Sequence, residues 1–315
     1  MWKDTLPTFH KKGYDDSAME NLLKDKKIID ERLDQLFSAR LLSKLEINHD
    51  LKRTLVSFQA NKKEPIYRWC KFKEGYSAAL VEYIIRKLGV ESGRVIDPFA
   101  GSGTTLFVSS KLSLDAVGIE LLPIGQEIMS VRKSLDEVNP HQLSASIKSW
   151  IESRPWTKEL ERLKFPHLKI TAGAFSETNE VGIEKYLAAL KKVKDSTLKK
   201  VLRFALLCIL EDVSYTRKDG QYLRWDRRSG RTRVGNFDKG GIPDFDSAIL
   251  SKLNQIYGDL AGLADSNEPK NTAPRGSIEV LNGSCLSILP GLKSADFDLL
   301  VTSPPYCNRL DYTRT

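Results

Sequence analysis

The residues of this chain best suited to chemistry form the run Thr302-Ser303-Pro304-Pro305-Tyr306. The Ser303 hydroxyl and the Pro304 carbonyl can accept hydrogen bonds, and proline has no N–H that would compete for these acceptors. The ring of Tyr306 offers a surface on which a flat base can stack. Such a loop can hold an amino group on a conjugated ring, make its nitrogen more tetrahedral and align it for attack on an electrophile.

A second segment, V-I-D-P-F-A-G-S-G-T-T over residues 95–105, is typical of a strand that enters a glycine loop and a helix. Gly101 and Gly103 remove Cβ atoms where backbone must approach a ligand closely. Glu120 follows Gly103 by 17 residues, at the tip of a second apolar run, where it can accept hydrogen bonds from ribose hydroxyls. A dinucleotide site would need a glycine at position 106, which is Leu106 here. This order predicts a Rossmann-like unit, with a purely structural turn as the alternative.

Together the two segments resemble the catalytic and cofactor loops of DNA amino-methyltransferases, which methylate an exocyclic base nitrogen with S-adenosylmethionine. The Ser-Pro-Pro-Tyr form is similar to that of cytosine-N4 enzymes, whereas adenine-N6 enzymes more often have Asp or Asn at the position of Ser303. Cytosine-C5 chemistry is disfavoured because it needs a Pro-Cys nucleophile, and Cys307 follows a tyrosine. The catalytic residues that the resemblance implies are Ser303, Pro304, Pro305 and Tyr306.

The resemblance also implies a site for S-adenosylmethionine and no metal. In such enzymes a stretch before the first strand folds over the methionine end of the cofactor, and residues 73–77 are expected to do so here. An ordinary helix entry is the alternative for that stretch. The implied cofactor-binding residues are Lys73, Glu74, Gly75, Ser77, Asp97, Pro98, Phe99, Gly101, Gly103, Thr104, Thr105 and Glu120.

Hydrophobic patterning predicts an α/β protein with a mainly helical insertion. The resemblance implies that its sheet is a Rossmann-like methyltransferase sheet. Strands are expected at 94–97, 116–120, 277–281 and 297–301, and helices at 78–88, 104–111, 150–163, 184–211 and 245–263. The expected domains are an N-terminal helical arm (1–62), a cofactor-binding half (63–139), a helical insertion for target recognition (140–275) and a catalytic-loop half (276–315).

The resemblance implies a seven-stranded sheet, and the patterning accounts for four of its strands. We therefore expect the C-terminal strands to be missing from this chain, which leaves the strand at 297–301 with an unpaired edge. Either a second polypeptide supplies the remaining strands or the chain is a truncated product.

The expected insertion contains a stretch, residues 214–233, in which arginines alternate with aromatic residues and glycines. Arginine pairs bidentately with phosphate or guanine, and aromatic rings stack on bases. A solvated surface loop is the alternative. The DNA-binding residues expected here are Arg217, Lys218, Tyr222, Arg224, Trp225, Arg227, Arg228, Arg231 and Arg233.

The composition agrees with a polyanionic partner, because the formal net charge is +8. No run approaches the roughly 18 apolar residues of a membrane span, and the N-terminus has no secretory pattern. Cys70, Cys208, Cys285 and Cys307 show no metal-ligand spacing, so free thiols in a reducing cytoplasm are expected.

The sequence thus predicts a site-specific enzyme that methylates cytosine N4 in duplex DNA after base flipping, in restriction–modification or defence. Adenine-N6 methylation, RNA methylation and a truncated chain that binds DNA without catalysis are the alternatives. The recognition sequence is not readable from these residues.

Overall fold

The computed structural model describes residues 51–52, 55–57, 59–72, 75–218, 223–231, 237–265 and 274–303. The chain divides into two compact units, residues 1–51 and 52–315, and almost all described residues belong to the second. Most of the expected N-terminal arm therefore lies outside the described residues. Of that arm, the short helix η1 (Ala60–Lys62) is described.

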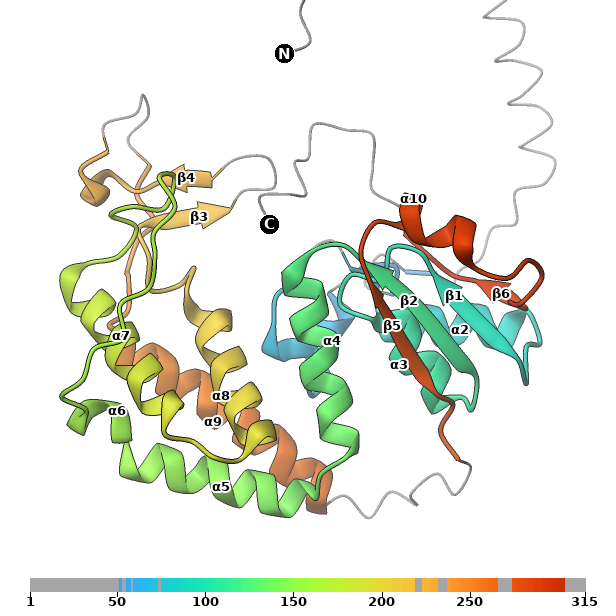
Figure 1. Cartoon of the computed structure of the whole chain (residues 1–315), viewed down its shortest axis with the longest axis horizontal. Helices are drawn as coiled ribbons and strands as arrows, with labels where there is room; N and C mark the ends of the chain where they lie inside the picture. The colour runs from blue at the N-terminus through green and yellow to red at the C-terminus, as the bar shows by residue number, and fades with distance from the viewer. Residues whose placement is uncertain are drawn as a thin grey trace, which may run out of the picture. The chain divides into compact units, whose positions relative to one another are not determined.

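The second unit contains a four-stranded parallel sheet with strand order β5-β2-β1-β6 (Figure 1). Strand β1 (Arg94–Asp97) lies between β2 (Asp115–Glu120) and β6 (Leu299–Leu300), and β5 (Ile278–Asn282) flanks β2. The predicted strands are therefore present, and the α/β class with a parallel sheet is confirmed. Because all pairings are parallel, the C-terminal ends of the strands meet at one edge of the sheet.

Three helices connect or cover these strands: α2 (Ala78–Lys87), α3 (Thr104–Lys111) and α4 (Pro123–Asp136). Helix α2 begins where the Ser77 hydroxyl accepts a hydrogen bond from the Leu80 N–H at 3.1 Å, as expected of an N-cap. Val81 of α2 packs with Val95 of β1 in one buried cluster. A short helix η2 (Tyr67–Trp69) precedes α2, and α10 (Cys285–Ile288) and η4 (Leu289–Gly291) follow β5.

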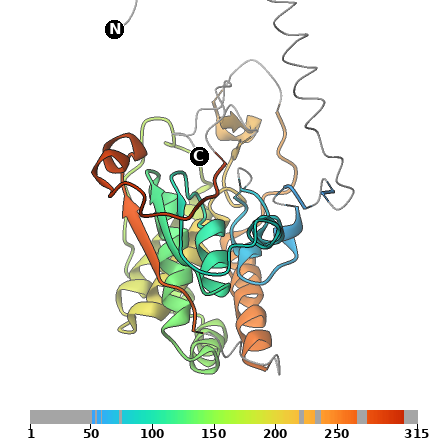
Figure 2. The same cartoon turned by 90° about the vertical axis from the view of Figure 1, so that its right-hand side faces the viewer.

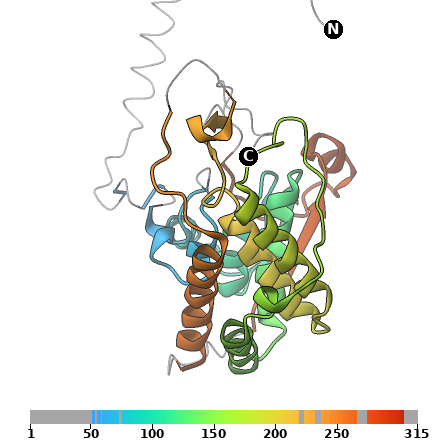
Figure 3. The same cartoon turned by 90° about the vertical axis from the view of Figure 1, so that its left-hand side faces the viewer.

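A block of helices stands beside the sheet; the sheet is nearer the viewer in Figure 2 and the block in Figure 3. Its members are α5 (Pro140–Ser153), α6 (Pro155–Lys158), α7 (Glu177–Lys191), α8 (Ser196–Ile209) and α9 (Phe245–Asp265). Their core includes Ile128 and Val131 of α4, whereas Met129 packs in the cluster against the sheet. Helix α4 is therefore shared by the sheet and the block.

Two predicted helices were wrong in extent. The helix expected at 150–163 is α5, which starts earlier and ends at Ser153, because Arg154 adopts the left-handed conformation (φ 43°) before Pro155 opens α6. The helix expected at 184–211 is two helices, α7 and α8. Asp195 is the N-cap of α8, because its side chain accepts a hydrogen bond from the Leu198 N–H at 2.8 Å.

The arginine-rich stretch, expected as a loop, contains an antiparallel pair of strands, β3 (Thr216–Lys218) and β4 (Leu223–Trp225). This pair and its flanking described residues up to Arg231 are called the arginine hairpin below. Among the described residues, every helix is too short or too polar to span a membrane.

Gly118 tests how tightly β2 packs against α3. A Cβ built there would lie 2.7 Å from the Leu106 side chain and 2.9 Å from that of Ala100. Gly118→Ala should therefore lower the free energy of unfolding in urea by about 1–3 kcal/mol through overpacking. The matched variant Gly258→Ala on α9, where a Cβ meets nothing within 4 Å, should instead raise it by about 0.5–1 kcal/mol. Equal stabilities of the two variants would contradict this packing.

Candidate active site

The candidate active site lies at the edge of the sheet where β1, β2 and β6 end. Asp97 closes β1, Glu120 closes β2, and Thr302 and Ser303 follow β6. Because β1 is the middle strand of the three, Asp97 lies between the glycine loop and the loop that starts at Thr302. The sheet thus brings together two segments about two hundred residues apart in sequence.

Asp97 is 1% exposed, and its carboxylate joins three segments. One oxygen accepts the Thr302 hydroxyl at 2.7 Å and the Phe99 N–H at 3.1 Å. The other accepts the Tyr76 hydroxyl at 2.9 Å. Tyr76 also contacts the hydroxyl of Thr105, which donates to the Val301 carbonyl at 3.3 Å. One buried carboxylate therefore connects the stretch before α2, the glycine loop and the loop that starts at Thr302.

The electrostatics of this cluster follow from its burial. Burial raises the pKa of the Asp97 carboxyl above its ordinary value, although the hydrogen bonds that it accepts oppose the rise. Burial and the neighbouring Asp97 raise the pKa of the Tyr76 phenol, so Tyr76 stays protonated and can keep donating its hydrogen bond. Asp97 was expected to contact the cofactor; the structure gives both of its oxygens protein partners.

Glu120 is the second carboxylate of the site and holds the glycine loop. Its oxygens accept the Gly101 N–H and the Leu122 N–H, each at 2.6 Å. Burial raises the pKa of the Glu120 carboxyl, and these two N–H groups oppose the rise. A Cβ at Gly125 would lie 2.5 Å from the Gly101 carbonyl oxygen, so α4 also fits closely under the loop.

The loop itself needs its glycines. Gly101 (φ 54°) and Gly103 (φ 76°) both adopt the left-handed conformation, which side chains disfavour. Phe72 covers Gly101, because a Cβ there would lie 3.0 Å from the Phe72 ring. Gly75 lies beside the Ser102 hydroxyl, so the stretch before α2 approaches the glycine loop; that residues 73–77 cover the cofactor stays a prediction.

The other expected cofactor residues differ in their burial and in whether the structure describes them. Thr104 and Thr105 are buried at the start of α3, where the Thr104 hydroxyl lies 3.3 Å from that of Ser102. Ser77 is 0% exposed, and its hydroxyl, which caps α2, donates to the Leu55 carbonyl. Phe99 is exposed, whereas its neighbour Pro98 is buried. Lys73, Glu74, Pro304, Pro305 and Tyr306 lie outside the described residues.

The residues present fit a nucleoside-containing cofactor such as S-adenosylmethionine. The glycine loop presents bare backbone, and each Glu120 oxygen can accept a further bond beside its single N–H partner. Phe99 and Leu121, which follow β1 and β2, expose apolar side chains at the same edge. A flat heterocycle can pack against such side chains.

Three residues of this site were not among those predicted from the sequence: Tyr76, Leu121 and Gly125. Tyr76 lies within the stretch 73–77 and Thr302 begins the Ser-Pro-Pro-Tyr run, but neither hydroxyl was predicted as a partner of a buried Asp97. Gly125 is close behind Glu120 in sequence, but its contact with Gly101 depends on how α4 packs.

The arginine hairpin contains arginines that serve its own fold. Arg228 binds Asp226 through two nitrogens, at 2.7 and 2.8 Å, and donates to the Gly240 carbonyl at 2.7 Å. Asp226 is 0% exposed, and the Arg228 guanidinium holds its pKa well below the usual range. Arg231 lies 4.1 Å from the Trp225 ring centroid and donates to three carbonyls of residues 169–172.

Other cations of the hairpin point outward. Arg217 and Arg224 occupy directly opposite positions of β3 and β4, and both are exposed. Their neighbours Thr216, Lys218, Leu223 and Trp225 are buried or half-buried, so the two arginines share the open face. Arg227 lies 3.4 Å from Asp238. Tyr222 and Arg233 are outside the described residues.

Within the described ranges, no group of three or more His, Cys, Asp or Glu side chains could hold a metal ion. Among the described residues, Cys70, Cys208 and Cys285 form no disulfide, and Cys307 lies beyond the described part.

Comparison with known proteins connects this geometry to methyltransferases. A family model described as DNA methylase matches residues 8–128, a range that includes β1, the glycine loop and β2. The chain is 44% identical over 286 residues to the Type II methyltransferase M.AvaI of Nostoc sp. (strain PCC 7120) and, equally, to M.AvaI of Anabaena variabilis. It is 36% identical over 287 residues to the Type II methyltransferase M.BsoBI of Geobacillus stearothermophilus.

These alignments cover 90% and 86% of this chain but 59% and 55% of the M.AvaI and M.BsoBI sequences. The chain therefore spans less than two thirds of the length of these relatives. No solved structure matches the chain significantly. The similarities to the family and to the relatives support a DNA methyltransferase.

The buried Asp97 predicts a specific pH dependence of stability. Because its folded pKa is raised above the unfolded value of about 3.9, the folded state keeps a proton that the unfolded chain has released just above that pH. The free energy of unfolding should therefore fall as pH rises from about 4 through the folded pKa. Denaturant titrations between pH 4 and 7 should show this fall in the wild type and a smaller one in Asp97→Asn.

Tyr76→Phe serves as the matched variant. It removes a hydrogen bond that lowers the pKa of Asp97, so the fall should extend to higher pH than in the wild type. Identical pH profiles for all three proteins would contradict the proposed ionisation of Asp97.

Proposed function

We propose that this chain carries the methyl-transfer site of a DNA methyltransferase that modifies the exocyclic N4 of cytosine in duplex DNA, in a restriction–modification system. The observation that carries the proposal is the Thr302–Asp97 hydrogen bond of 2.7 Å. It fixes the start of the Ser-Pro-Pro-Tyr loop beside the glycine loop, so the acceptor of a target amine and the cofactor loop share one edge of the sheet. The Type II methyltransferase relatives support this assignment.

S-adenosylmethionine would supply an electrophilic methyl group on a sulfonium sulfur. On the protein side, Glu120 would accept hydrogen bonds from the ribose hydroxyls while it holds the Gly101 N–H. The bare backbone at Gly101 and Gly103 allows close approach of the ligand. Phe99 and Leu121 would flank its base.

Ser303 would accept a hydrogen bond from the target amino group, together with the Pro304 carbonyl. This bond draws the nitrogen lone pair out of the ring, so that the nitrogen can attack the methyl carbon. The N–C bond forms as the C–S bond breaks, its electron pair stays on sulfur as a thioether, and the nitrogen loses one proton to solvent. Tyr306 would stack on the flipped base.

Cytosine N4 is proposed over adenine N6 because serine occupies position 303. Adenine N6 is the second candidate, since the name of the matching family model covers both N6 and N4 methyltransferases.

The deciding experiment measures tritium transfer from labelled S-adenosylmethionine to duplex DNA, by this chain alone and with the product of the adjacent gene. Mass spectrometry then identifies the modified nucleoside. N4-methylcytosine would support the proposal in full. N6-methyladenine would support a DNA methyltransferase but identify adenine N6, not cytosine N4, as the target. Transfer to RNA alone, or no transfer in either arrangement, would contradict it.

The two halves of the site should be separable by mutation. Ser303→Ala should slow transfer by about a hundredfold or more while cofactor affinity stays within about twofold, because one acceptor of the target amine is lost. Glu120→Ala should weaken cofactor binding by about 1–3 kcal/mol, the scale of a lost hydrogen bond to a charged group. Calorimetry with S-adenosylhomocysteine and steady-state transfer measure the two effects.

Ser146→Ala on α5, whose hydroxyl bonds only the Gln142 carbonyl within its own helix, is the control and should match the wild type. If Ser303→Ala lost cofactor affinity and transfer equally, the role assigned to Ser303 would be wrong.

We further propose that the open face of the arginine hairpin contacts DNA through Arg217 and Arg224. The two arginines lie directly opposite each other on the exposed face of the strands, so this face is positively charged. A phosphate backbone is an anion that such a face attracts, and a two-stranded ribbon fits the major groove. Arg228 and Arg231, by contrast, would support the hairpin from within through their contacts with Asp226 and Trp225.

The double variant Arg217→Ala/Arg224→Ala should bind DNA more weakly, and the slope of log K against log salt should fall by about 2 if both contact phosphates. The control Arg86→Ala/Lys148→Ala removes two exposed cations from α2 and α5. In Figure 1, α5 lies at the opposite end of the helical block from β3 and β4. An unchanged slope in the hairpin variant would rule out the contact.

A further inference from the structure

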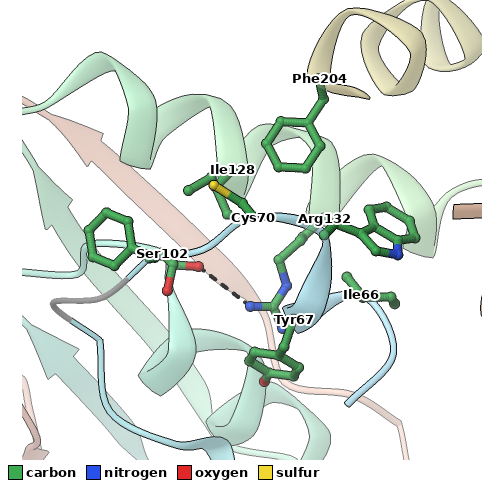
Figure 4. Close-up of a pocket in the computed structure, with 9 residues that line it drawn as sticks. Ile66, Tyr67, Cys70, Ser102, Ile128, Arg132 and Phe204 are labelled. Carbon is green, nitrogen blue, oxygen red and sulfur yellow. Dashed lines mark hydrogen bonds between the residues drawn. The ribbon is translucent and has the colours of Figure 1, made fainter. Parts of the chain in front are cut away.

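Arg132 is a cation buried behind the glycine loop. It belongs to α4 and is 9% exposed. Its guanidinium lies in a small cavity between the loop and the helical block, lined also by Ser102, Cys70 and Phe204 (Figure 4). Burying a charge is costly unless other groups compensate it. In the described part of the chain, no carboxylate forms an ion pair with Arg132, and its partners there are of another kind.

Two aromatic rings and one carbonyl are those partners. The Arg132 Cζ lies 3.9 Å from the ring centroids of both Tyr67 and Phe107. Two aromatic rings therefore contact the guanidinium directly. A guanidinium nitrogen also donates to the Ser102 carbonyl at 3.4 Å (Figure 4). Cation–π attraction strengthens when the charge is removed from water, as it is here.

Each partner belongs to a different part of the candidate site. Ser102 lies between the two left-handed glycines of the loop, Phe107 lies on the first turns of α3, and Tyr67 lies in η2. The next residues anchor η2 to α9, because Asp259 accepts the Trp69 indole N–H at 2.8 Å and a nitrogen of Arg68 at 3.1 Å. The Tyr67 ring is therefore held in place independently of the loop.

We propose that Arg132 is a positioning residue for the cofactor loop, which it holds at the Ser102 carbonyl while Tyr67 and Phe107 clamp its guanidinium. A loop with two glycines has wide conformational freedom, and that freedom must be lost before the loop can bind a ligand. Glu120 fixes the N–H of Gly101 and Arg132 fixes the carbonyl of Ser102, so neighbouring residues of the loop are held from two sides. Arg132 donates to the loop from α4 and touches no reacting atom.

This inference rests on the proposed function in one respect, namely that the loop binds S-adenosylmethionine. The contacts of Arg132 with the two rings and the Ser102 carbonyl require the planar shape of arginine as well as its charge. Lysine at position 132 would keep the charge and could reach one carbonyl, but an ammonium cannot lie flat between two rings. Methionine would fill the slot without donating any hydrogen bond.

The test measures binding of S-adenosylhomocysteine by calorimetry, together with KM for the cofactor, KM for DNA, kcat and the melting temperature. Arg132→Met should weaken cofactor binding by about tenfold and raise the cofactor KM in proportion, while KM for DNA stays within about twofold. Arg132→Lys should recover part of this loss. Arg203→Met, which removes an exposed arginine of α8, is the matched control and should bind the cofactor as the wild type does.

If Arg132 only filled space, Arg132→Met and Arg132→Lys would melt at lower temperature yet bind the cofactor with wild-type affinity, and that result would overturn the inference. If Arg132→Met does not fold, Tyr67→Leu serves as the second variant, because it keeps the arginine and removes one of the two rings. Tyr67→Leu should weaken cofactor binding severalfold. Unchanged cofactor binding in this variant would also overturn the inference. A wild-type chain that binds no cofactor would instead refute the proposed function.

Discussion

The structure of the site depends on one buried carboxylate, that of Asp97. An ionised carboxylate away from water is stable only if hydrogen bonds replace its hydration. Asp97 finds those bonds on three segments: Thr302 after β6, Tyr76 before α2 and the Phe99 N–H in the glycine loop. Each donor satisfies Asp97 and is itself fixed by it. The same group that would be costly to bury therefore sets the relative positions of the glycine loop and the loop that starts at Thr302.

Glu120 and Arg132 extend this arrangement to the glycine loop. Glu120 holds the Gly101 N–H from the end of β2, and Arg132 reaches the Ser102 carbonyl from α4. Helix α4 packs on both sides: Met129 packs in the cluster against the sheet, and Ile128 and Val131 pack in the core of the helical block. Because that core also includes residues of α8 and α9, the block that carries the arginine hairpin and the loop proposed to bind the cofactor rest on a common helix.

The arginine hairpin shows why composition alone does not identify a binding surface. Its arginines look alike in the sequence, but they differ in surroundings. Arg228 neutralises the buried Asp226, and Arg231 packs on Trp225 and caps carbonyls of a neighbouring segment. Arg217 and Arg224 share the exposed face of β3 and β4. The alternation of strand residues between two faces, rather than charge itself, separates the supporting arginines from the two that we propose contact DNA.

The sequence predicted the α/β class and the strands that end at Asp97 and Glu120, because apolar runs and glycine pairs act over a few residues. It did not show where α5 ends or that two helices replace the one expected at 184–211, since helical patterning continues smoothly across both breaks. Only the tertiary structure paired Thr302 with Asp97, placed Gly125 under Gly101 and enclosed Arg132 between two rings. Those contacts join residues from separate elements, and the packing of strands and helices, which no local pattern encodes, decides which of them meet.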